Sequence, residues 1–406
     1  MTLERISLER APAGPVRLPA GGAAGVEIKV FADLAAAEET WRGLQLAAHT
    51  EPQQSFNWVA AWARTGGSAQ DLRVVAGFDA GGACLFLLPL AITNHVGIRV
   101  LEWLGNGQGN YAAGLFHSAF LEDAARASFA DLWCEVLAAL PPVDAVHLAD
   151  QPRELGRHEN PFLALPHAVS PEPGRWFALD PDWRRHHEAR FSSSSRRELH
   201  RCERRLADRG ALAFIHATEP ETRRRVFAAM IAQKRAQFAN SGIDDFFADG
   251  AIEAFYARLM DALQDPDGLS LQLFALQCGG DIVATNMGVM VKNRFYGLIS
   301  STAAGPLRRF APGNILFLRM VGHLAGAGVE VLDCGAGGDA HKLRWCTGER
   351  ARFHTIEGLT LQGELYARGL QSHLALKRAV KHSSALWPIA KEVRRLKGRT
   401  LRLLAV

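Results

Sequence analysis

The sequence predicts a mixed α/β protein built from two similar lobes. The chain has 406 residues, enough for two domains, and 48% of them are hydrophobic, which supports full cores. The order strand, helices, antiparallel strands, helix, strand occurs in both halves. Between the halves, residues 152–173 are irregular and hold several prolines and glycines, which is typical of a domain junction. Each lobe is expected to contain a mixed, mostly antiparallel sheet flanked by helices.

Residues 1–25 are rich in alanine, proline and glycine and are expected to form a disordered tail. We expect the N-terminal lobe to cover residues 26–165. Hydrophobic periodicity predicts its elements in this order: strand Val26–Phe31, helix Leu34–Ala48, strands Leu72–Phe78, Cys84–Ile92 and Arg99–Leu104, helix Asp123–Leu140 and strand Ala145–Ala149.

The C-terminal lobe is expected over residues 174–365. Its predicted elements are helix Ser194–Arg209, strand Ala211–His216, helices Pro220–Asn240 and Ala251–Leu263, strands Leu269–Gln277, Ile282–Val291 and Arg294–Ser301, a long apolar helix opening near Pro312, and strand Val329–Asp333. The turn Cys278-Gly279-Gly280-Asp281 predicts a hairpin between the first two of these strands. A strand-like stretch, Ala351–Thr360, closes the lobe.

Residues 366–406 are strongly basic, and leucines are interspersed among the lysines and arginines. This pattern predicts amphipathic C-terminal helices. They would either rest on an anionic lipid surface as a peripheral membrane contact or pack against the second lobe.

Composition and charge narrow the functional class. A formal net charge of +4 is too small to indicate a nucleic-acid binder, so no specific nucleic acid is expected as a partner. The six cysteines are far apart and lack the spacing of a zinc site, so we expect no metal and reduced thiols. No signal peptide or spanning apolar run is recognisable. We therefore expect a cytoplasmic protein, at the inner face of the membrane if its basic segment binds lipid.

The segment Arg308-Arg309-Phe310-Ala311-Pro312-Gly313-Asn314 opens the long apolar helix. Free backbone N–H groups and the helix dipole favour an anion at such a start, and Arg308 and Arg309 add positive charge. Pro312 suits the first helical position, and Gly313 lets a ligand approach the backbone. The segment predicts a cradle for a phosphate-bearing cofactor; the alternative is a simple proline-initiated helix.

Two carboxylates and a tyrosine are candidates for acid–base chemistry. Asp333 ends a predicted strand, and Asp339 follows a glycine-rich turn. A partly buried carboxylate near a reacting carbonyl would accept a proton from an attacking amine, whereas the alternative for Asp333 is a turn cap. Tyr296, on the third strand of the hairpin unit, would reprotonate a leaving thiolate or simply pack in the core.

A basic and aromatic cluster follows the glycine turn. Lys342, Arg344 and Trp345 would hold an anionic acceptor, or form a solvated helix start with the tryptophan in the core. Lys234, on helix Pro220–Asn240, is a further candidate for contact with the acceptor. Helix Ser194–Arg209 carries six arginines, which is typical either of a solvated face or of a surface for an anionic substrate or tRNA.

Several of these segments together resemble a known family. They are Ser192–Gly210, Met230–Arg235, Phe310–Leu316, and Asp333-x-Gly-x-Gly followed by Asp339-x-x-Lys342-x-Arg344-Trp345. In this order they resemble the acetyltransferase-like domain of the CelD-like GNAT proteins, which are related to the FemAB aminoacyl transferases. The first half resembles it through Ser55-x-x-Trp58-x-x-x-Trp62 and Leu104-Gly105…Asn110-Tyr111, with Asn110 where an aspartate is usual.

The resemblance implies that both lobes have the GNAT fold and that the second transfers an acyl group from acyl-CoA to an amine. The acceptor it suggests is a small molecule or glycan, such as an amino sugar or a cell-envelope or polysaccharide precursor. The amine is expected to attack the acyl-CoA thioester directly, without a covalent enzyme intermediate. We assign Arg308, Arg309, Pro312, Gly313 and Asn314 to the donor, Asp333 and Tyr296 to catalysis, and Lys234, Asp339, Lys342, Arg344 and Trp345 to the acceptor.

Two other functions remain open. The segment Val331–Gly338 also looks like the first motif of S-adenosylmethionine methyltransferases, although it comes late in the chain for a doubly wound nucleotide fold. Alternatively, both lobes are non-catalytic and serve as a scaffold in polysaccharide biosynthesis. Stabilisation by coenzyme A, by S-adenosylmethionine or by neither distinguishes the three functions.

Overall fold

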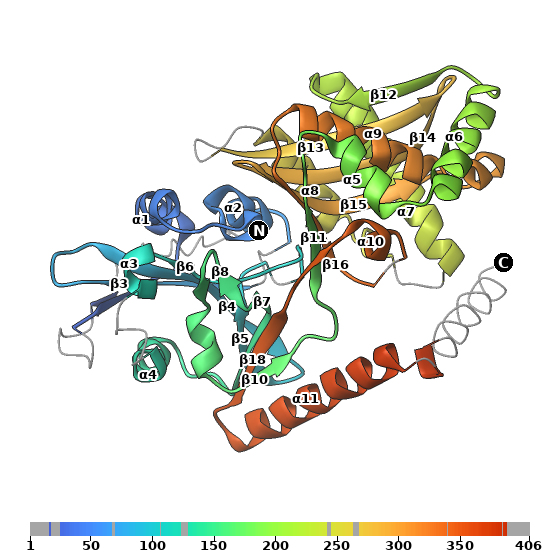
Figure 1. Cartoon of the computed structure of the whole chain (residues 1–406). Coiled ribbons are helices and arrows are strands. Elements are labelled where there is room, and N and C mark those ends of the chain that lie inside the picture. Colours follow the sequence, from blue (N-terminus) through green and yellow to red (C-terminus); the bar gives the residue numbers. More distant parts are fainter. Residues whose placement is uncertain are drawn as a thin grey trace, which may run out of the picture.

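The computed structural model confirms an α/β protein with two mixed sheets, one in each lobe (Figure 1). The structure describes residues 16–17, 25–66, 70–105, 107–122, 129–241, 245–262, 268–338, 340–383 and 385–387. Most of the predicted tail, all of the basic segment after residue 387, and Asp339 lie outside the described residues.

The N-terminal lobe is a sheet with helices on both faces. Its elements are β1 (Val16–Arg17), β2 (Glu27–Phe31), α1 (Leu34–Ala47), η1 (Pro52–Gln54), α2 (Phe56–Ala63), β3 (Asp71–Phe78), β4 (Cys84–His95), β5 (Ile98–Trp103), β6 (Leu115–Phe116), α3 (Ser118–Glu122), α4 (Phe129–Ala139), β7 (Ala145–Pro152), the small hairpin β8 (Glu154–Leu155) and β9 (His158–Glu159), η3 (Pro161–Ala164) and β10 (His167–Val169). The sheet order is β1-β2-β3-β4-β5-β7-β18-β10, with β6 paired to β4.

The C-terminal lobe repeats this plan. Its elements are β11 (Gly174–Ala178), α5 (Trp183–Arg190), α6 (Ser193–Ala207), β12 (Leu212–His216), α7 (Pro220–Ser241), α8 (Ala251–Asp261), β13 (Leu269–Cys278), β14 (Asp281–Val291), β15 (Arg294–Thr302), η4 (Pro306–Phe310), α9 (Pro312–Gly326), β16 (Val331–Ala336), α10 (Ala340–Trp345) and β17 (Gly348–Arg350). The sheet order is β12-β13-β14-β15-β16-β11-β17. The predicted hairpin is present, because β13 and β14 pair antiparallel around the glycine turn.

The chain returns to the first sheet at its end. After β17, strand β18 (Arg352–Gly358) pairs antiparallel with β7 and also with β10. The stretch predicted to close the C-terminal lobe therefore lies in the N-terminal sheet. Sequence pattern predicts that a strand exists but not which sheet it joins, because the pairing is decided by residues about two hundred positions away.

One hydrophobic core is shared by the two lobes. Ser55 caps α2 by accepting from the Trp58 N–H at 3.3 Å, and the helix then presents Trp58 and Trp62 one turn apart. Both indole rings meet Phe255 of α8 edge-on, with centroids 5.2 and 5.7 Å away. The tryptophan pair that the sequence singled out therefore joins the lobes.

Helix α11 (Leu361–His382) begins at its cap Thr360, whose hydroxyl accepts from the Gly363 N–H at 3.2 Å. It packs along β18 and β7 at the outer margin of the N-terminal lobe (Figure 1). The predicted alternative of a terminal helix packed on the second lobe is therefore wrong for α11. The helix follows β18 directly, and so it stays with the sheet that β18 joins.

Candidate acyl-transfer site

The parallel strands β15 and β16 separate in the middle of the C-terminal sheet. They pair over only three residues of each strand, ending at Tyr296 and Asp333. Beyond this point β15 continues along β14, while β16 continues along β11. Leu298 is an extra residue of β15 relative to β14, so a β-bulge lies beside the split. Backbone groups at a split and a bulge lack their regular sheet partners, which leaves them free for other ligands.

A side chain from the first lobe enters this split. The Asn110 side-chain amide donates to the Gly297 carbonyl of β15 at 2.9 Å and accepts from the Ala336 N–H of β16 at 3.2 Å. Gly335 has φ +72°, and any Cβ there would collide with the Asn110 amide. The position needs a group that donates on one side and accepts on the other. An amide does both and a carboxylate does not, which explains asparagine where an aspartate is usual.

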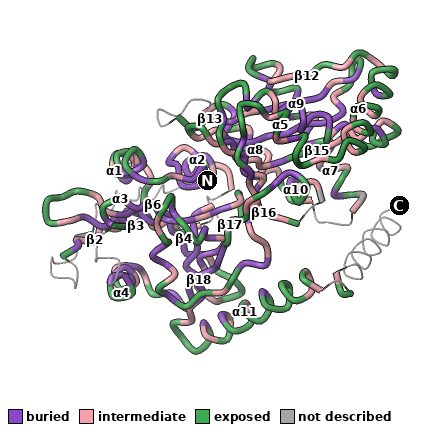
Figure 2. Tube along the Cα trace, viewed as in Figure 1, coloured by how far each residue is buried: buried purple, intermediate pink, exposed green. Residues whose placement is uncertain are grey.

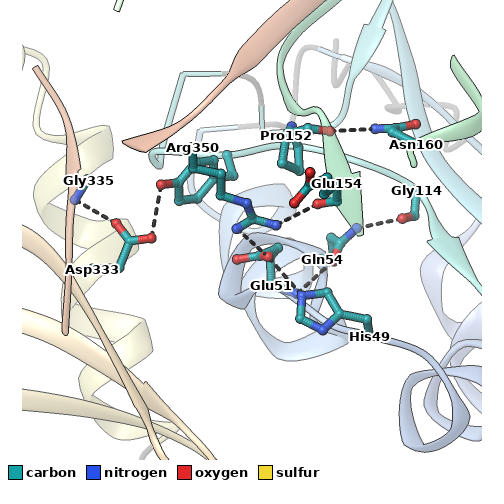
Figure 3. A network of polar contacts seen from close by, with 11 residues as sticks. His49, Glu51, Gln54, Gly114, Pro152, Glu154, Asn160, Asp333, Gly335 and Arg350 are labelled. Atoms are coloured by element: carbon teal, nitrogen blue, oxygen red, sulfur yellow. Dashed lines mark hydrogen bonds and ion pairs between the residues drawn. The ribbon is translucent and has the colours of Figure 1, made fainter. Parts of the chain in front are cut away.

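Asp333 is fully buried and bound to the first lobe. Its carboxylate accepts from the Tyr111 hydroxyl at 2.9 Å and from the Gly335 N–H at 2.7 Å (Figure 3). Burial raises the pKa of Asp333, although both hydrogen bonds act to lower it. The neighbouring Leu332 packs in the core beneath α9, so Asp333 faces the opposite side of the sheet.

A second buried acid continues this network. The Glu51 carboxylate pairs with the Arg350 guanidinium at 2.7 Å and with His49 at 3.0 Å (Figure 3). Burial alone would raise the pKa of Glu51, but Arg350 and His49 hold it well below its usual value. Arg350 also lies 4.7 Å from the centre of the Tyr111 ring and donates to the Glu154 carbonyl at 2.8 Å. The network therefore ties both lobes together through charge-assisted contacts.

Tyr296 lies beside Asp333. The two residues are opposite one another in the β15–β16 ladder, and Tyr296 is buried, which raises its pKa well above the usual value. The side chain lines a cavity of about 200 Å³ between the lobes, together with His49 and Arg294. The structure thus brings the two predicted catalytic residues together, in an interior position between the lobes.

A larger cavity, of about 610 Å³, opens at the start of α9. Ala311 is in the left-handed conformation, φ +50°, and precedes Pro312 at the first position of the helix without supplying a side-chain cap. Ala311 and Asn314 line the cavity. An uncapped start of a 15-residue helix beside open space is suited to an anion.

The opposite wall comes from α5, α6 and α10. The lining residues from these helices are His187, Ser194, Ser195, Glu198, Leu199, Cys202, His341, Arg344 and Trp345, and Phe191 at the end of α5 joins them. Trp345 stacks on His187 with ring centroids 5.4 Å apart. Burial, and then the charge of Arg196, lowers the pKa of His187, so its imidazole is neutral at physiological pH. The cavity therefore combines an aromatic wall with hydroxyls, one guanidinium and one carboxylate.

The residues predicted to hold the donor are partly at this cavity. Asn314 lines it, whereas Pro312 is buried beneath the helix start. A Cβ on Gly313 would come within 2.9 Å of the Thr302 methyl group, so this glycine permits close packing of α9 on β15. Arg308 and Arg309 are exposed on η4, and Arg309 lies over the Phe310 ring.

The residues predicted to hold the acceptor are dispersed. Arg344 and Trp345 line the cavity. The Lys342 ammonium donates to the Ala336 carbonyl and so fixes α10 to the end of β16. Lys234 lies on α7, which packs on the other face of the sheet from α9, and Asp339 lies outside the described residues.

The described residues also bear on metal binding and on membrane insertion. In the part of the chain that the structure describes, no group of three or more His, Cys, Asp or Glu side chains is placed to hold a metal ion. None of the described helices is both long and apolar enough to span a bilayer.

Residues 193–343, from α6 to α10, match the family described as Acetyltransferase (GNAT) domain. The C-terminal lobe is therefore a GNAT acetyltransferase domain. The matched segment includes the split strands, α9 and most of the cavity wall, so both features of the site belong to the part of the chain that carries the family. The GNAT family to which this segment belongs implies an acyl-CoA donor.

Several solved structures of low sequence identity are similar to this chain over most of its length. FemX matches over 82% of this chain and 98% of its own, with 11% identity and a TM-score of 0.53, which shows a shared fold. The C-terminal domain of a putative lysylphosphatidylglycerol synthetase from Agrobacterium fabrum matches over 85% and 97%, with 12% identity and a TM-score of 0.49. A tandem GNAT protein from the clavulanic acid biosynthesis pathway matches over 82% and 98%, with 13% identity and a TM-score of 0.47. No curated protein sequence matches the chain.

Sequence reasoning missed most of the cavity wall. The arginines of α6 predict a solvated face or an anion-binding surface. The α6 residues at the cavity, however, include Ser194, Glu198 and Cys202, none of which is an arginine. Their spacing of four residues was the available signal, because it puts them on one side of a helix. The Glu51–Arg350 pair gave no local signal at all.

Proposed function

We propose that the chain transfers an acyl group from acyl-CoA to a small amine, with the donor's diphosphate at the start of α9. The observation that carries the proposal is the cavity of about 610 Å³ at an uncapped helix start within a GNAT domain. Backbone N–H groups of α9 and the hydroxyls of Ser194 and Ser195 would hold phosphate oxygens. Arg344 on the opposite wall would contribute positive charge.

The acceptor we propose is an amine that also carries polar or acidic groups, such as an amino sugar of a cell-envelope or polysaccharide precursor. In the reaction the amine nitrogen forms a bond to the acyl carbon, the bond from that carbon to sulfur breaks, and the thiolate takes up a proton. The amine must first lose a proton to a base. Asp333 and Tyr296 are the predicted acid–base groups. Asp333 faces away from the cavity and both residues are buried, so the reacting atoms must reach them through the strand split, at the place that the Asn110 amide occupies.

The decisive experiment measures binding of coenzyme A and acetyl transfer from acetyl-CoA to a panel of amino sugars. We expect saturable coenzyme A binding by calorimetry and acetylated product by mass spectrometry. Arg344→Glu should weaken coenzyme A binding about tenfold, because one attraction at a solvent-accessible rim is replaced by repulsion. Arg258→Glu makes the same charge change at an exposed position of α8, which packs on the other face of the sheet. This variant should bind coenzyme A as tightly as the wild type.

Stabilisation by S-adenosylmethionine instead of coenzyme A would contradict the proposal in favour of methyl transfer. Stabilisation by neither ligand would favour the scaffold. Equal affinities of coenzyme A for the wild type and Arg344→Glu would place the donor elsewhere.

A further inference from the structure

Helix α11 is apolar on two opposite faces. Gly363, Ala367 and Leu374 are buried against the N-terminal sheet. Leu361, Leu365 and Leu376 are 83%, 66% and 64% exposed. At 3.6 residues per turn these three leucines lie within about 60° of one another, on the side away from the sheet. Figure 2 shows α11 exposed along most of its length. Three large apolar side chains on one outward face indicate a surface that is covered in use.

The same helix carries a cationic surplus. Its only acidic residue is Glu364, which pairs with Arg368 at 2.7 Å. Lys381 pairs with Glu172 at 2.7 Å. Lys377 and Arg378 are exposed and form no ion pair within the described residues. Two positive charges are therefore available on the two flanks of α11, each about 100° around the helix axis from the nearest of the outward leucines.

A groove runs along the inner side of this surface. It has a volume of about 490 Å³ and lies between α11 and β10, the last strand of the N-terminal sheet. Ala168, Val169, Leu374, Ala375 and Ala379 form its apolar wall, and Arg378 and His382 form its cationic end. An apolar trough with cations at one end matches an acyl chain beneath an anionic headgroup.

We propose that the outward face of α11 docks on an anionic lipid bilayer, with the helix lying in the plane of the surface. Leu361, Leu365 and Leu376 enter the acyl region, while Lys377 and Arg378 contact headgroup phosphates. Charge decides between a bilayer and a second copy of the chain. A self-complementary contact through α11 would bring two cationic surfaces together, whereas an anionic bilayer complements the same charge.

The test uses the full chain and sedimentation with lipid vesicles. Vesicles of phosphatidylcholine alone are compared with vesicles in which about one third of the lipid is phosphatidylglycerol. We expect the protein to bind the anionic vesicles and to dissociate at high salt. The triple variant L361S/L365S/L376S should bind at least about tenfold more weakly, because exposed leucines add apolar burial only when they are inserted. The double variant K377E/R378E should lose the preference for anionic lipid.

A matched control is available on the first lobe. Leu46, on α1, is also large and 70% exposed, and L46S should bind vesicles like the wild type. All four proteins should bind coenzyme A equally, so a failure of lipid docking is distinct from a failure of the acyltransferase proposal. Absence of wild-type binding to anionic vesicles would overturn the inference, as would equal binding by the leucine triple variant. A dimer in solution that the triple variant abolishes, without vesicle binding, would assign the face to a second copy.

Discussion

The two lobes contain the same strand arrangement but surround it differently. In each lobe two parallel strands pair over three residues and then separate: β5 and β7 in the first, β15 and β16 in the second. In the second lobe, α9 follows β15 after a short 3-10 turn, and a cavity of about 610 Å³ lies at its start. In the first lobe, a glycine-rich loop follows β5 and closes back on β7, where the Ala112 N–H donates to the Asp150 carbonyl at 3.2 Å.

The void left beneath that loop is about 20 Å³, roughly the space of one water molecule. The first lobe therefore lacks room for a cofactor at the position where the second has it. Instead, its loop supplies Asn110 and Tyr111, both of which bind β16 of the second lobe. The comparison teaches that a helix after the split makes a binding site, whereas a loop there becomes a support for the neighbouring lobe.

The largest effect is expected from adding negative charge to the cavity of the second lobe. Asn314→Glu places a carboxylate beside the start of α9 on an exposed position. The new carboxylate would repel a phosphate of coenzyme A bound about 5 Å away. At an effective dielectric constant near 20 this repulsion is about 3 kcal/mol, so coenzyme A affinity should fall about a hundredfold. Titration calorimetry measures this directly.

Leu46→Glu adds the same charge to the exposed surface of α1 in the first lobe and serves as control. We expect its affinity to equal that of the wild type. A loss in Leu46→Glu that matched the loss in Asn314→Glu would remove the distinction between the lobes.

An intermediate effect is expected where the first lobe supports the second. Asn110→Asp keeps an acceptor for the Ala336 N–H but places a carboxylate against the Gly297 carbonyl, which then lacks its donor. Loss of a partly buried hydrogen bond of this kind costs about 1 kcal/mol or more. Urea denaturation should show a lower midpoint for the variant.

The same substitution elsewhere has the opposite expectation. Asn57 accepts from the Arg42 guanidinium at 2.7 Å, so Asn57→Asp should be neutral or slightly stabilising. If Asn110→Asp were as stable as the wild type, the hydrogen bonds of the Asn110 amide across the strand split would contribute nothing to the free energy of unfolding.

The smallest effect is expected in how the free energy of unfolding depends on pH through the ionisation of Asp333. Its pKa is raised in the folded state, so it contributes stability that is present below its ordinary pKa of 3.8 and is lost as pH rises through the raised value. Asp333→Asn does not titrate. The stability advantage of the wild type over this variant should therefore shrink as pH rises from about 4 through the raised pKa of Asp333, by about 1.4 kcal/mol for each unit of pKa shift.

Denaturation at several pH values measures this difference, and kcat at neutral pH tests the catalytic role separately. A kcat loss of about a hundredfold or more with the fold intact would support Asp333 as proton acceptor. Unchanged kcat would mean that Asp333 only helps to hold the two lobes together. Tyr111→Phe removes a hydrogen bond that lowers the pKa of Asp333, so it should move the same transition to higher pH.

Local patterns predicted most of the fold. The glycine hairpin between β13 and β14 and the proline start of α9 both appear where their residues indicated them, since a turn or a cap is decided by a few neighbours. Strands β11 and β17 were not predicted. They are short, with five and three residues, and they pair with strands distant in the chain.

The site was less predictable than the fold for the same reason. Asn314, Arg344 and Trp345 follow recognisable signals, and all three line the cavity. The contacts of Asp333 with Tyr111 and of Glu51 with Arg350 join positions hundreds of residues apart. Their partners exist only once the two lobes pack together, so no window of sequence reveals them.

The return of β18 to the first sheet has a consequence for how this protein is made. Until the ribosome has synthesised β18, one edge of strand β7 is unpaired and β10 has no partner strand. The sheet of the first lobe therefore stays incomplete while the second lobe is being synthesised. A gene fragment limited to residues 193–343 would also lack β11, the strand that covers β16. Neither lobe is therefore expected to fold by itself, and recombinant expression requires both lobes in one chain.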